Sequence, residues 1–184
     1  MKFVEPIRDK AWLEEFTQYF KNRRARDYVL FMTGLHTGLR ISDILDLRVR
    51  DVEGTHLMIE EQKTGKYKRI IITPALRKIL NEYCEDKRRT EYLFPSRIKT
   101  RTGKAKPIDR TTAYKILKDA AKAIGYTEPI GTHSLRKTFG YTFYQKYKDI
   151  GALQKLFNHD KPTTTLFYIG AGQDDLDDKM THLY

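Results

Sequence analysis

The amino-acid sequence predicts an α+β fold that is mostly helical, with one small antiparallel sheet. Three observations lead to this prediction. Apolar residues recur at helical spacing through most of the chain. Only two short runs, "THLMIEEQ" and "YKRIIIT", are suited to strands, and the glycine-containing turn "KTGK" separates them. The length of 184 residues suits one compact domain with one good core.

The first buried helix is expected around residues 28–35, because "YVLFMTGL" is apolar on nearly every side. Gly34 and Gly38 loosen the backbone near "HTGLR", so Arg40 should emerge from the core there. A second short helix begins at this arginine, because the apolar residues of "ISDILDL" recur at helical spacing. The two strands follow and form a hairpin that presents Lys63 near its bend.

The second half of the chain is predicted to be helical apart from one loop. Thr73 and Pro74 suit the N-cap and the first position of a helix, and Asp109 and Gly125 suit the two ends of another. Shorter helices should follow, and then a polar tail that begins at Gln173. The ranges expected for these helices are roughly 133–147, 150–157 and 163–169.

The loop "SRIKTRTGKAKP" lacks apolar periodicity and carries many positive charges. Such a loop suits a phosphate backbone, and it equally suits a solvated surface. Its candidate DNA-binding residues are Lys99, Arg101, Lys104 and Lys106.

The composition points to an anionic partner. Lysine and arginine number 35 against 24 aspartates and glutamates, for a net charge of +11 at pH 7. Nucleic acid is the commonest such partner, although a ribosome-associated or membrane-surface protein has the same balance. Cys84 is the only cysteine, which excludes an internal disulfide and a cysteine metal site and fits a reducing cytoplasm. We expect a cytoplasmic protein, because no stretch is apolar enough for a signal peptide or a membrane span.

Five segments carry residues that could act on a phosphate. His133 and Arg136 lie three positions apart in "HSLRKT", so both should project from one face of a helix. Leu135, Phe139 and Phe143 can supply its buried side. A metal site is poorly supported, because no histidine or carboxylate stands nearby at a matching spacing. The other four segments are "TGLRISD" with Arg40, "QKTGKYKR" with Lys63, "LFNHD" with His159 and "TTTLFYI" with Tyr168.

Breaking a phosphodiester without a metal requires cationic donors, because charge on the non-bridging oxygens must be stabilised as phosphorus becomes five-coordinate. Arg40 and Arg136 suit this task, since guanidinium groups offer paired donors and stay charged. Tyr168 suits the nucleophile, although a phenol with a pKa of about 10 needs a base or a cationic field. Each residue has a structural alternative: Arg40 and His159 could cap helices, Lys63 could be a solvated turn charge, and the tyrosine could pack in the core.

The order and spacing of these segments resemble the tyrosine recombinases, the phage integrase family of site-specific DNA recombinases. The resemblance runs from Arg40 to Tyr168 and matches the family's catalytic domain. It implies that residues 1–184 form one such domain, which cleaves and rejoins double-stranded DNA through a 3′-phosphotyrosine intermediate. It also implies that neither a metal nor a nucleotide cofactor takes part.

The resemblance implies roles for the other residues. His133 assists as general base, and His159 donates a hydrogen bond to a phosphate oxygen. Asp43 fits the family's acidic position and could orient an active-site side chain, or it could simply favour the first turn of a helix. The proton for the leaving 5′ oxygen comes from a lysine, and this role is assigned to Lys63 because "KTG" matches the family's turn. Two further lysines of the hairpin are close enough to compete for that role: Lys66 and Lys68.

The sequence departs from the family in two places. Family members commonly carry a separate N-terminal DNA-binding domain, and too few residues precede the first buried helix to form one. The chain is then either the catalytic domain of a longer protein or a short member that binds DNA weakly or needs an accessory DNA-binding protein. Phe157 and Asn158 stand where the family has a small residue and glycine, which puts the turn before His159 in question.

The C-terminal tail is a candidate for contact between subunits. In the family, the segment after the nucleophile often docks on a neighbouring subunit, and recombination proceeds in a tetramer. Residues 173–184 are acidic at first and end with apolar residues, so they could dock on a basic neighbour. A frayed terminus is the alternative.

Three other functions compete with recombination. A type IB topoisomerase uses a similar tyrosine and set of cations to nick and reseal one strand. A noncatalytic DNA-binding regulator would keep the fold and the charge, yet it would form no covalent adduct. A basic RNA-binding protein would explain the charge but not the five segments.

Overall fold

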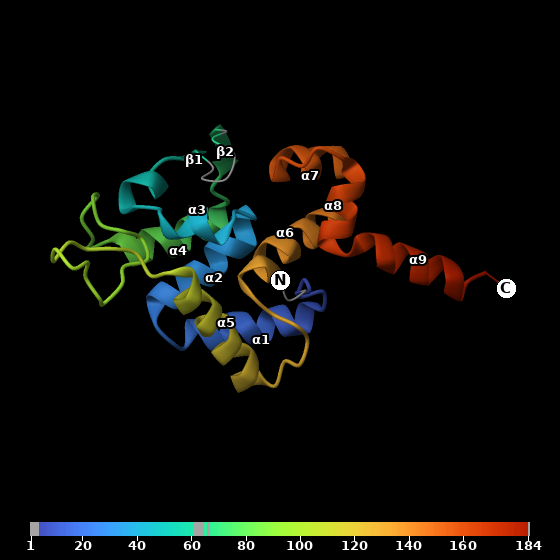
Figure 1. Ribbon diagram of the computed structural model, residues 1–184, viewed down its shortest axis with the longest axis horizontal. Coiled ribbons are helices and arrows are strands. Elements are labelled where there is room, and N and C mark those ends of the chain that lie inside the picture. Colours follow the sequence, from blue (N-terminus) through green and yellow to red (C-terminus); the bar gives the residue numbers. More distant parts are fainter. Residues whose placement is uncertain (1–3, 61–64, 66, 184) are drawn as a thin grey trace.

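The computed structural model describes residues 4–60, 65 and 67–183, and it confirms the predicted fold class, a mostly helical fold with one two-stranded antiparallel sheet (Figure 1). In chain order the elements are α1 (Lys10–Lys21), α2 (Ala25–Thr37), α3 (Ile41–Leu45), the 3-10 helix η1 (Val49–Val52), β1 (His56–Glu60), β2 (Tyr67–Ile71), α4 (Pro74–Cys84), α5 (Arg110–Ile124), α6 (Thr132–Tyr147), α7 (Ile150–Phe157), α8 (Pro162–Ile169) and α9 (Ala171–Thr181).

The helix ends predicted from local sequence are confirmed. The Thr73 side chain accepts a hydrogen bond from the backbone N–H of Leu76 and caps α4. Asp109 caps α5 in the same way, with a distance of 2.7 Å from its Oδ1 to the backbone nitrogen of Thr112. At the other end of α5, Gly125 is left-handed with φ 77°. These ends depend on residues within one turn of the helix, so the sequence alone predicts them.

The prediction missed two helices. α1 begins after Asp9, whose carboxylate accepts a hydrogen bond from the backbone N–H of Ala11, and it buries Phe16 and Phe20. α9 replaces the expected polar tail, and its several aspartates obscured the helical spacing of Leu176 and Met180. In α9 the aspartates weaken the apolar pattern on which the prediction relied, whereas α1 has a clear apolar stripe that the prediction did not use.

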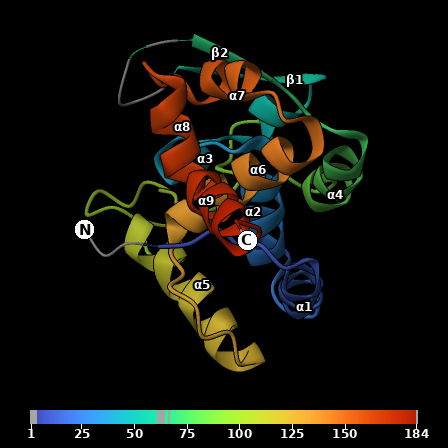
Figure 2. The ribbon, with the colours of Figure 1, turned by 90° about the vertical axis from the view of Figure 1, so that its right-hand side faces the viewer.

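α2 and α6 lie at the centre of the molecule, where three groups of buried side chains meet (Figure 1). The first group joins α2 to α3, the hairpin, α4 and the start of α5. The second joins α1, α2, α5 and the first turn of α6. The third joins α6 to α7 and α8. Figure 2 shows the hairpin and α7 at one end of the molecule and α5 at the other.

Two glycines let α6 approach its neighbours closely. A Cβ atom on Gly34 of α2 would lie 2.6 Å from the Leu135 side chain of α6. A Cβ atom on Gly140 would lie 2.7 Å from both Phe157 and Ile169. Contacts that short do not occur between packed carbon atoms, so only glycine permits this spacing. The helices that carry the candidate residues are therefore packed directly against α6.

The sheet is a hairpin in which β1 pairs with β2, with Met58 opposite Arg69. Its inner face buries Leu57, Ile59 and Ile70 against the first core group. The predicted bend of this hairpin falls largely outside the described residues, and Lys63 and Lys66 lie there. Among the residues that the structure describes, no helix is both long and apolar enough to cross a membrane.

Candidate active site

Arg136 lies at the centre of the candidate site and is buried, with only 3% of its surface exposed. Its Nη1 donates to the backbone carbonyl of Gly38 at 2.6 Å, and its Nη2 donates to that of Phe157 at 3.0 Å. The guanidinium carbon also lies 4.2 Å from the centroid of the Phe157 ring. Two carbonyl partners and an aromatic face compensate the cation for lost hydration and fix its plane.

The expectation that Arg136 projects from an open face of its helix is wrong. The first half of α6 is buried on nearly every side, including Ser134, Leu135 and Thr138. α2 packs on one side of this segment, and α7 and α8 pack on another. His133 is the exception, because it stands at the exposed start of the helix. Periodicity within α6 could not predict this, since burial depends on elements distant in sequence.

Besides supplying a carbonyl to Arg136, Gly38 forms the turn that leads from α2 to Arg40. It ends α2 in a left-handed conformation with φ 61°, and a Cβ atom there would lie 2.3 Å from the Phe139 ring. The chain turns at this glycine and reaches Arg40, the half-buried N-cap residue of α3. The two arginines are therefore linked through the same turn, although they are 96 positions apart in the chain (136 − 40 = 96).

Tyr168 lies on α8, with its hydroxyl 3.3 Å from Nδ1 of His133. Its ring packs edge-to-face on Phe157 at a centroid distance of 5.7 Å and on His159 at 5.3 Å. Burial raises the pKa of Tyr168, while the charges of Arg136 and Arg40 and a hydrogen bond to Arg136 oppose that rise. The phenol is therefore protonated at neutral pH and lies next to a histidine that can accept its proton.

The pKa of His133 is lowered from its ordinary value. Partial desolvation of the ring is the main cause, although the residue as a whole remains exposed, and the positive charges of Arg136 and Lys137 add to it. The imidazole is therefore neutral at neutral pH. A neutral imidazole can accept a proton, which the general-base role expected for His133 requires.

His159 is held between α7 and α8. Its Nδ1 lies 3.0 Å from Oγ1 of Thr165, which is fully buried, and its backbone N–H donates to the carbonyl of Gln154 at 3.1 Å. The Gln154 side chain donates in return to the His159 carbonyl at 2.9 Å. Desolvation first, then Arg136, Arg40 and Lys68, lower the pKa of His159 to about 4. With Nδ1 bonded to threonine, Nε2 is the nitrogen placed to meet a ligand.

The turn before His159 forms despite the missing glycine. Asn158 ends α7 in the left-handed region, with φ 53° and ψ 48°. Asparagine tolerates this conformation better than most residues do. The doubt that the "LFNH" segment raised about this turn is therefore removed.

Asp43 lies in the first turn of α3 and is buried, with its backbone N–H donating to the Arg40 carbonyl at 3.0 Å. Of its side-chain contacts, Oδ1 lies 3.4 Å from the Ser42 hydroxyl. Lys63 lies outside the described residues. Lys68, one of its two competitors, donates from Nζ to the Leu156 carbonyl at 2.7 Å, and its charge reaches His159. The structure thus brings Lys68 close to the site.

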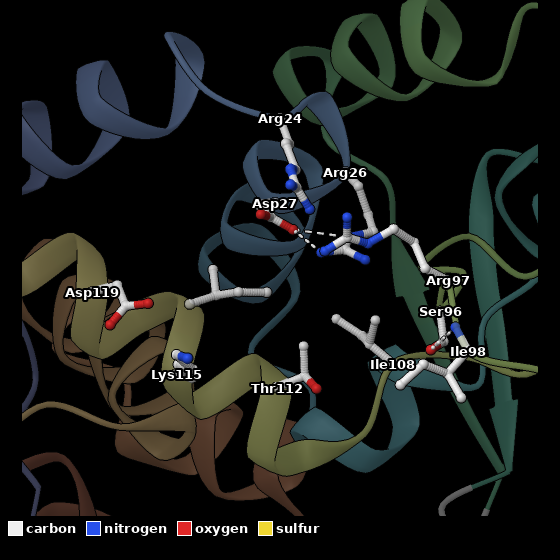
Figure 3. A pocket seen from close by; sticks show the side chains of 11 residues that line it. Arg24, Arg26, Asp27, Ser96, Arg97, Ile98, Ile108, Thr112, Lys115 and Asp119 are labelled. Carbon is white, nitrogen blue, oxygen red and sulfur yellow. Dashed lines mark hydrogen bonds and ion pairs between the residues drawn. The ribbon is translucent and has the colours of Figure 1, made fainter.

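The basic loop contributes to a separate cleft of about 680 Å³ (Figure 3). Arg97 and Ile98 come from the loop, and Arg24, Arg26 and Lys115 come from the start of α2 and from α5. Figure 3 shows three guanidinium groups turned toward the space above α5. None of the four predicted loop cations lines this cleft: Lys99, Arg101 and Lys104 are exposed, and Lys106 is half-buried.

Sequence reasoning missed Arg24 and Arg26 because they are far from the loop in the chain, and it missed Lys115 because that residue belongs to the following helix, α5. Arg97 lies in the same basic segment as the four predicted cations, and only its tertiary neighbours distinguish it. Arg26 is already paired with Asp27 at 2.8 Å and also donates to the Pro95 carbonyl. For metals, no cluster of three or more His, Cys, Asp or Glu side chains occurs within the described part of the chain.

Comparison with known proteins places these features in context. The family model described as "Phage integrase family" matches residues 9–173. "Probable integrase/recombinase YoeC" of Bacillus subtilis is 49% identical over 175 residues, which cover 95% of this chain and 93% of that protein. A "Tyrosine recombinase" of Pseudothermotoga lettingae is 30% identical over 154 residues, covering 82% of this chain but 51% of that protein. The chain thus spans nearly all of the first relative and about half of the second.

Two solved structures share the fold. The crystal structure of XerA recombinase matches with a TM-score of 0.76 and 19% identity, covering 98% of this chain and 66% of that one. The structure of XerH recombinase bound to its difH substrate before cleavage matches with a TM-score of 0.70 and 20% identity, covering 91% of this chain and 52% of that one.

The field of the two arginines predicts how the DNA-free protein responds to acid. We expect the His159 ring to titrate at about pH 4. An unfolded histidine, with a pKa of about 6.5, binds its proton first as the pH falls. The difference between the two His159 pKa values therefore contributes to the free energy of unfolding. This contribution is present above pH 6.5 and is lost between about pH 6.5 and pH 4. NMR titration of the ring measures the pKa, and urea unfolding of the wild type and of His159→Asn at neutral and acid pH measures the linkage.

Arg40→Gln should raise the His159 pKa toward its ordinary value, because one of the cations beside it is removed. Lys78→Gln, at an exposed position on α4, is the matched control and should leave it unchanged. A His159 pKa at or above its ordinary value in the wild type would contradict the cationic field.

Proposed function

The chain belongs to the phage integrase family, the tyrosine recombinases, whose members cleave and rejoin DNA; from this premise we propose that residues 1–184 form one catalytic domain with Tyr168 as nucleophile. The observation that carries the proposal is the grouping around one phenol. The hydroxyl of Tyr168 lies 3.3 Å from His133, and Arg136 and His159 contact the same side chain. His133 is 35 positions from Tyr168 in the chain, so the meeting of these two segments supports a common task.

Cleavage begins with the phenol. The Tyr168 hydroxyl transfers its proton to neutral His133, and the phenolate oxygen attacks phosphorus. The bond from phosphorus to the 5′ oxygen breaks, and the 3′ phosphate remains on the tyrosine as an ester. Rejoining is the reverse reaction, in which a 5′ hydroxyl attacks that ester. No external energy source is needed, because one ester replaces another.

Arg40 and Arg136 supply the charge that the five-coordinate phosphorus requires. Both already act on the Tyr168 hydroxyl, where their charges oppose the rise in its pKa. A phosphate placed next to that hydroxyl would lie in the same positive field. Lysine at either position would keep a charge but lose the planar pair of donors, so it should not restore the reaction.

His159 serves as a donor to the phosphate in this proposal. Its Nδ1 is engaged with Thr165, which leaves Nε2 for the substrate. Besides desolvation, nearby cations lower its pKa, and a bound phosphate would partly neutralise them. Binding should therefore raise the pKa and favour the imidazolium, in which both ring nitrogens carry a proton. Asp43, buried beside Arg40, has a supporting role in keeping that segment in place.

Lys63 remains the proposed acid for the leaving 5′ oxygen, on the strength of the "KTG" turn that it shares with the family. Lys68 is the competing candidate, because its charge reaches His159 and its Nζ bonds the Leu156 carbonyl. That carbonyl would hold the Lys68 ammonium away from a leaving group, which favours Lys63 for the acid and Lys68 for structure.

The chemistry predicts a covalent adduct between protein and DNA. The protein is incubated at low salt with nicked duplexes tiled from the DNA that flanks its own gene, and a denaturant-stable, protease-sensitive band is sought on a gel. Tyr168→Phe should abolish the band, because it removes the hydroxyl that is proposed to form the ester. Arg136→Lys should reduce its rate of formation by at least about 100-fold.

Tyr19→Phe is the matched control, since Tyr19 lies on α1 and packs against the second core group, so loss of its hydroxyl should leave the adduct unchanged. A wild-type protein that binds these duplexes yet forms no adduct, even in a longer form or with an accessory DNA-binding protein, would favour the noncatalytic regulator. Exchange between two duplexes, measured in the same reaction, separates recombination from nicking and resealing.

Double-stranded DNA is the proposed substrate, and the cleft of Figure 3 is proposed to contact its backbone together with the exposed lysines of the neighbouring loop. α5 connects this cleft to the active site. The charge of Arg110, at the start of α5, reaches His133, and Thr112 and Lys115 of the same helix line the cleft. A duplex lying along α5 would therefore meet positive charge at both places.

The cleft predicts a change in the salt dependence of DNA binding. Arg24→Gln combined with Arg97→Gln should weaken binding and reduce the slope of log K against log salt by up to about 2, because each lost phosphate contact contributes about 0.9. Fluorescence anisotropy over a range of salt concentrations measures this slope. Lys78→Gln is again the matched control, and an equal loss of slope in that variant would sink the assignment of the cleft.

Assembly through α9 is proposed for the protein on DNA. α9 extends away from the other helices in Figure 1. Leu176 and Met180 are at least half exposed and lie on one side of α9 at helical spacing, and Leu183, beyond the end of the helix, is exposed as well. A second cleft, of about 910 Å³, is lined by Leu35, Ile71, Phe139, Phe143 and Tyr147 among others.

Charge favours α9 of another copy as the occupant of this second cleft. The segment of α9 carries four aspartates in "AGQDDLDDKMT". His56, Arg69 and Lys146 line the cleft beside its apolar residues. A segment with an acidic sequence and exposed apolar residues would thus meet an apolar cleft lined by bases, and repetition of this contact around a ring would close a tetramer.

Met180→Asp should therefore reduce the size of the assembly on DNA, because it places a charge in the apolar contact. Mass photometry of the DNA complex measures the size. Thr181→Asp adds the same charge to α9 away from the stripe and is the matched control. If both variants assemble as the wild type does, α9 is not the docking segment.

A further inference from the structure

Lys137 has no part in the chemistry described so far, yet it is buried beside it. It follows Arg136 on α6 and has only 6% of its surface exposed. A lysine is rarely buried to this degree unless its ammonium group has partners. Its Nζ lies 5.4 Å from the centroid of the Tyr168 ring, over the ring face. The side chain therefore contacts the proposed nucleophile rather than solvent.

An N-terminal strap, defined as residues 4–9, lies along α6 and comes close to Lys137. The Ile7 backbone N–H donates to Oγ1 of Thr138 at 2.8 Å, and Ile7 itself is buried. The Glu5 N–H donates to the Pro129 carbonyl at 2.9 Å. These two hydrogen bonds fix the strap on the segment that precedes α6 and on α6 itself.

The charges of the strap act on Lys137. Glu5 and Arg8 form an ion pair at 2.8 Å. Burial lowers the pKa of the Lys137 ammonium, the Glu5 carboxylate opposes this by favouring the charged form, and Arg8 adds to the lowering. A carboxylate on one side and an aromatic face on another are suited to hold an ammonium group in one direction.

The strap also covers the end of the nucleophile's helix. Gly170, two residues after Tyr168, ends α8 with φ 75°. A Cβ atom at Gly170 would lie 2.5 Å from Nη2 of Arg8 and 3.7 Å from Oε2 of Glu5. The same ion pair thus acts on Lys137 and lies against the end of α8.

We propose that Lys137 is a positioning residue for Tyr168, whose ammonium holds the ring face of the nucleophile while Glu5 and Arg8 direct it. The proposal rests on the function proposed for Tyr168. The charged and titratable groups that face the phenol are His133, Arg136 and Lys137 from α6, Arg40 from the start of α3, and His159 from the turn before α8.

Lys137 differs from the two arginines in where its charge lies. The arginines act at the hydroxyl, whereas Nζ lies over the ring. A cation at a ring face is attracted more strongly to a phenolate than to a phenol, because the phenolate carries charge into the ring. Lys137 should therefore hold the ring in the attacking orientation and assist loss of the proton.

Lys137→Met, which keeps the length and removes the charge, tests the proposal, with Lys137→Arg as the variant that keeps the charge. We expect Lys137→Met to form the covalent adduct on the order of 10- to 100-fold more slowly, and we expect its rate to rise with pH over a more alkaline range. Lys137→Arg should recover most of the rate. Lys78→Met, at an exposed position on α4, controls for loss of a lysine.

A substrate with sulfur in place of the bridging 5′ oxygen separates the nucleophile from the leaving group. A thiolate leaves without a proton, so a defect in the general acid disappears on this substrate. We expect the defect of Lys137→Met to persist on it, and the defect of Lys63→Met to be relieved. Relief of the Lys137→Met defect would instead make Lys137 the acid and overturn the positioning role.

A second measurement does not depend on DNA. NMR titration of tyrosine labelled with ¹³C at Cζ, with the Tyr168 signal assigned by its absence in Tyr168→Phe, gives the pKa of the phenol. We expect a higher Tyr168 pKa in Lys137→Met than in the wild type. An unchanged pKa together with an unchanged cleavage rate would overturn the inference. A wild type that forms no adduct would instead overturn the proposed function, and the titration would then decide the inference alone.

Glu5→Gln is the variant that tests the positioning role if Lys137→Met does not fold. It removes the carboxylate that directs the ammonium and leaves the lysine in place. We expect it to raise the Tyr168 pKa and slow adduct formation less than Lys137→Met would. A Glu5→Gln variant with a wild-type thermal midpoint and with both values unchanged would count against the strap.

Discussion

The buried guanidinium of Arg136 is the interaction on which the rest of the site depends. Its two carbonyl partners belong to Gly38 and Phe157, which stand at the C-terminal ends of α2 and α7. Carbonyls at such ends lack partners within their own helix and carry partial negative charge. One side chain on α6 therefore satisfies two helix ends and ties together α2, α6 and α7, with Arg40 just after α2, His133 on α6 and His159 just after α7.

The cations of the site are held close to one another and to the phenol. Desolvation lowers the pKa of both histidines and raises that of Tyr168, and Arg40 and Arg136 add to the first effect and oppose the second. Neutral histidines beside two permanent cations favour the binding of an anion, because the negative charge of a phosphate would offset the repulsion between the two arginines. The same field thus serves substrate binding, proton acceptance by His133 and stabilisation of charge on phosphorus. Lys137 and the strap extend it to the ring face.

Several features could be predicted from the sequence because they depend on neighbours along the chain. The caps at Thr73, Asp109 and Gly125 and the pairing of the hairpin strands are of this kind. α9 escaped the prediction for a local reason as well, because its apolar residues are sparse among aspartates, whereas the apolar stripe of α1 was present in the sequence and was not used. The order of the five segments identified the family, because such an order does not depend on how the chain folds.

The sequence by itself determined the fold class, the helix ends and the types of residue that could act on a phosphate. Tertiary structure alone decided where those residues stand. It buried Arg136 instead of exposing it, placed His133 against Tyr168, brought Lys68 near His159, and set Arg97 beside cations of α2 and α5. The physical reason is that burial, pKa and hydrogen bonding depend on groups many positions away, and packing around Gly34, Gly38 and Gly140 fixes which groups meet.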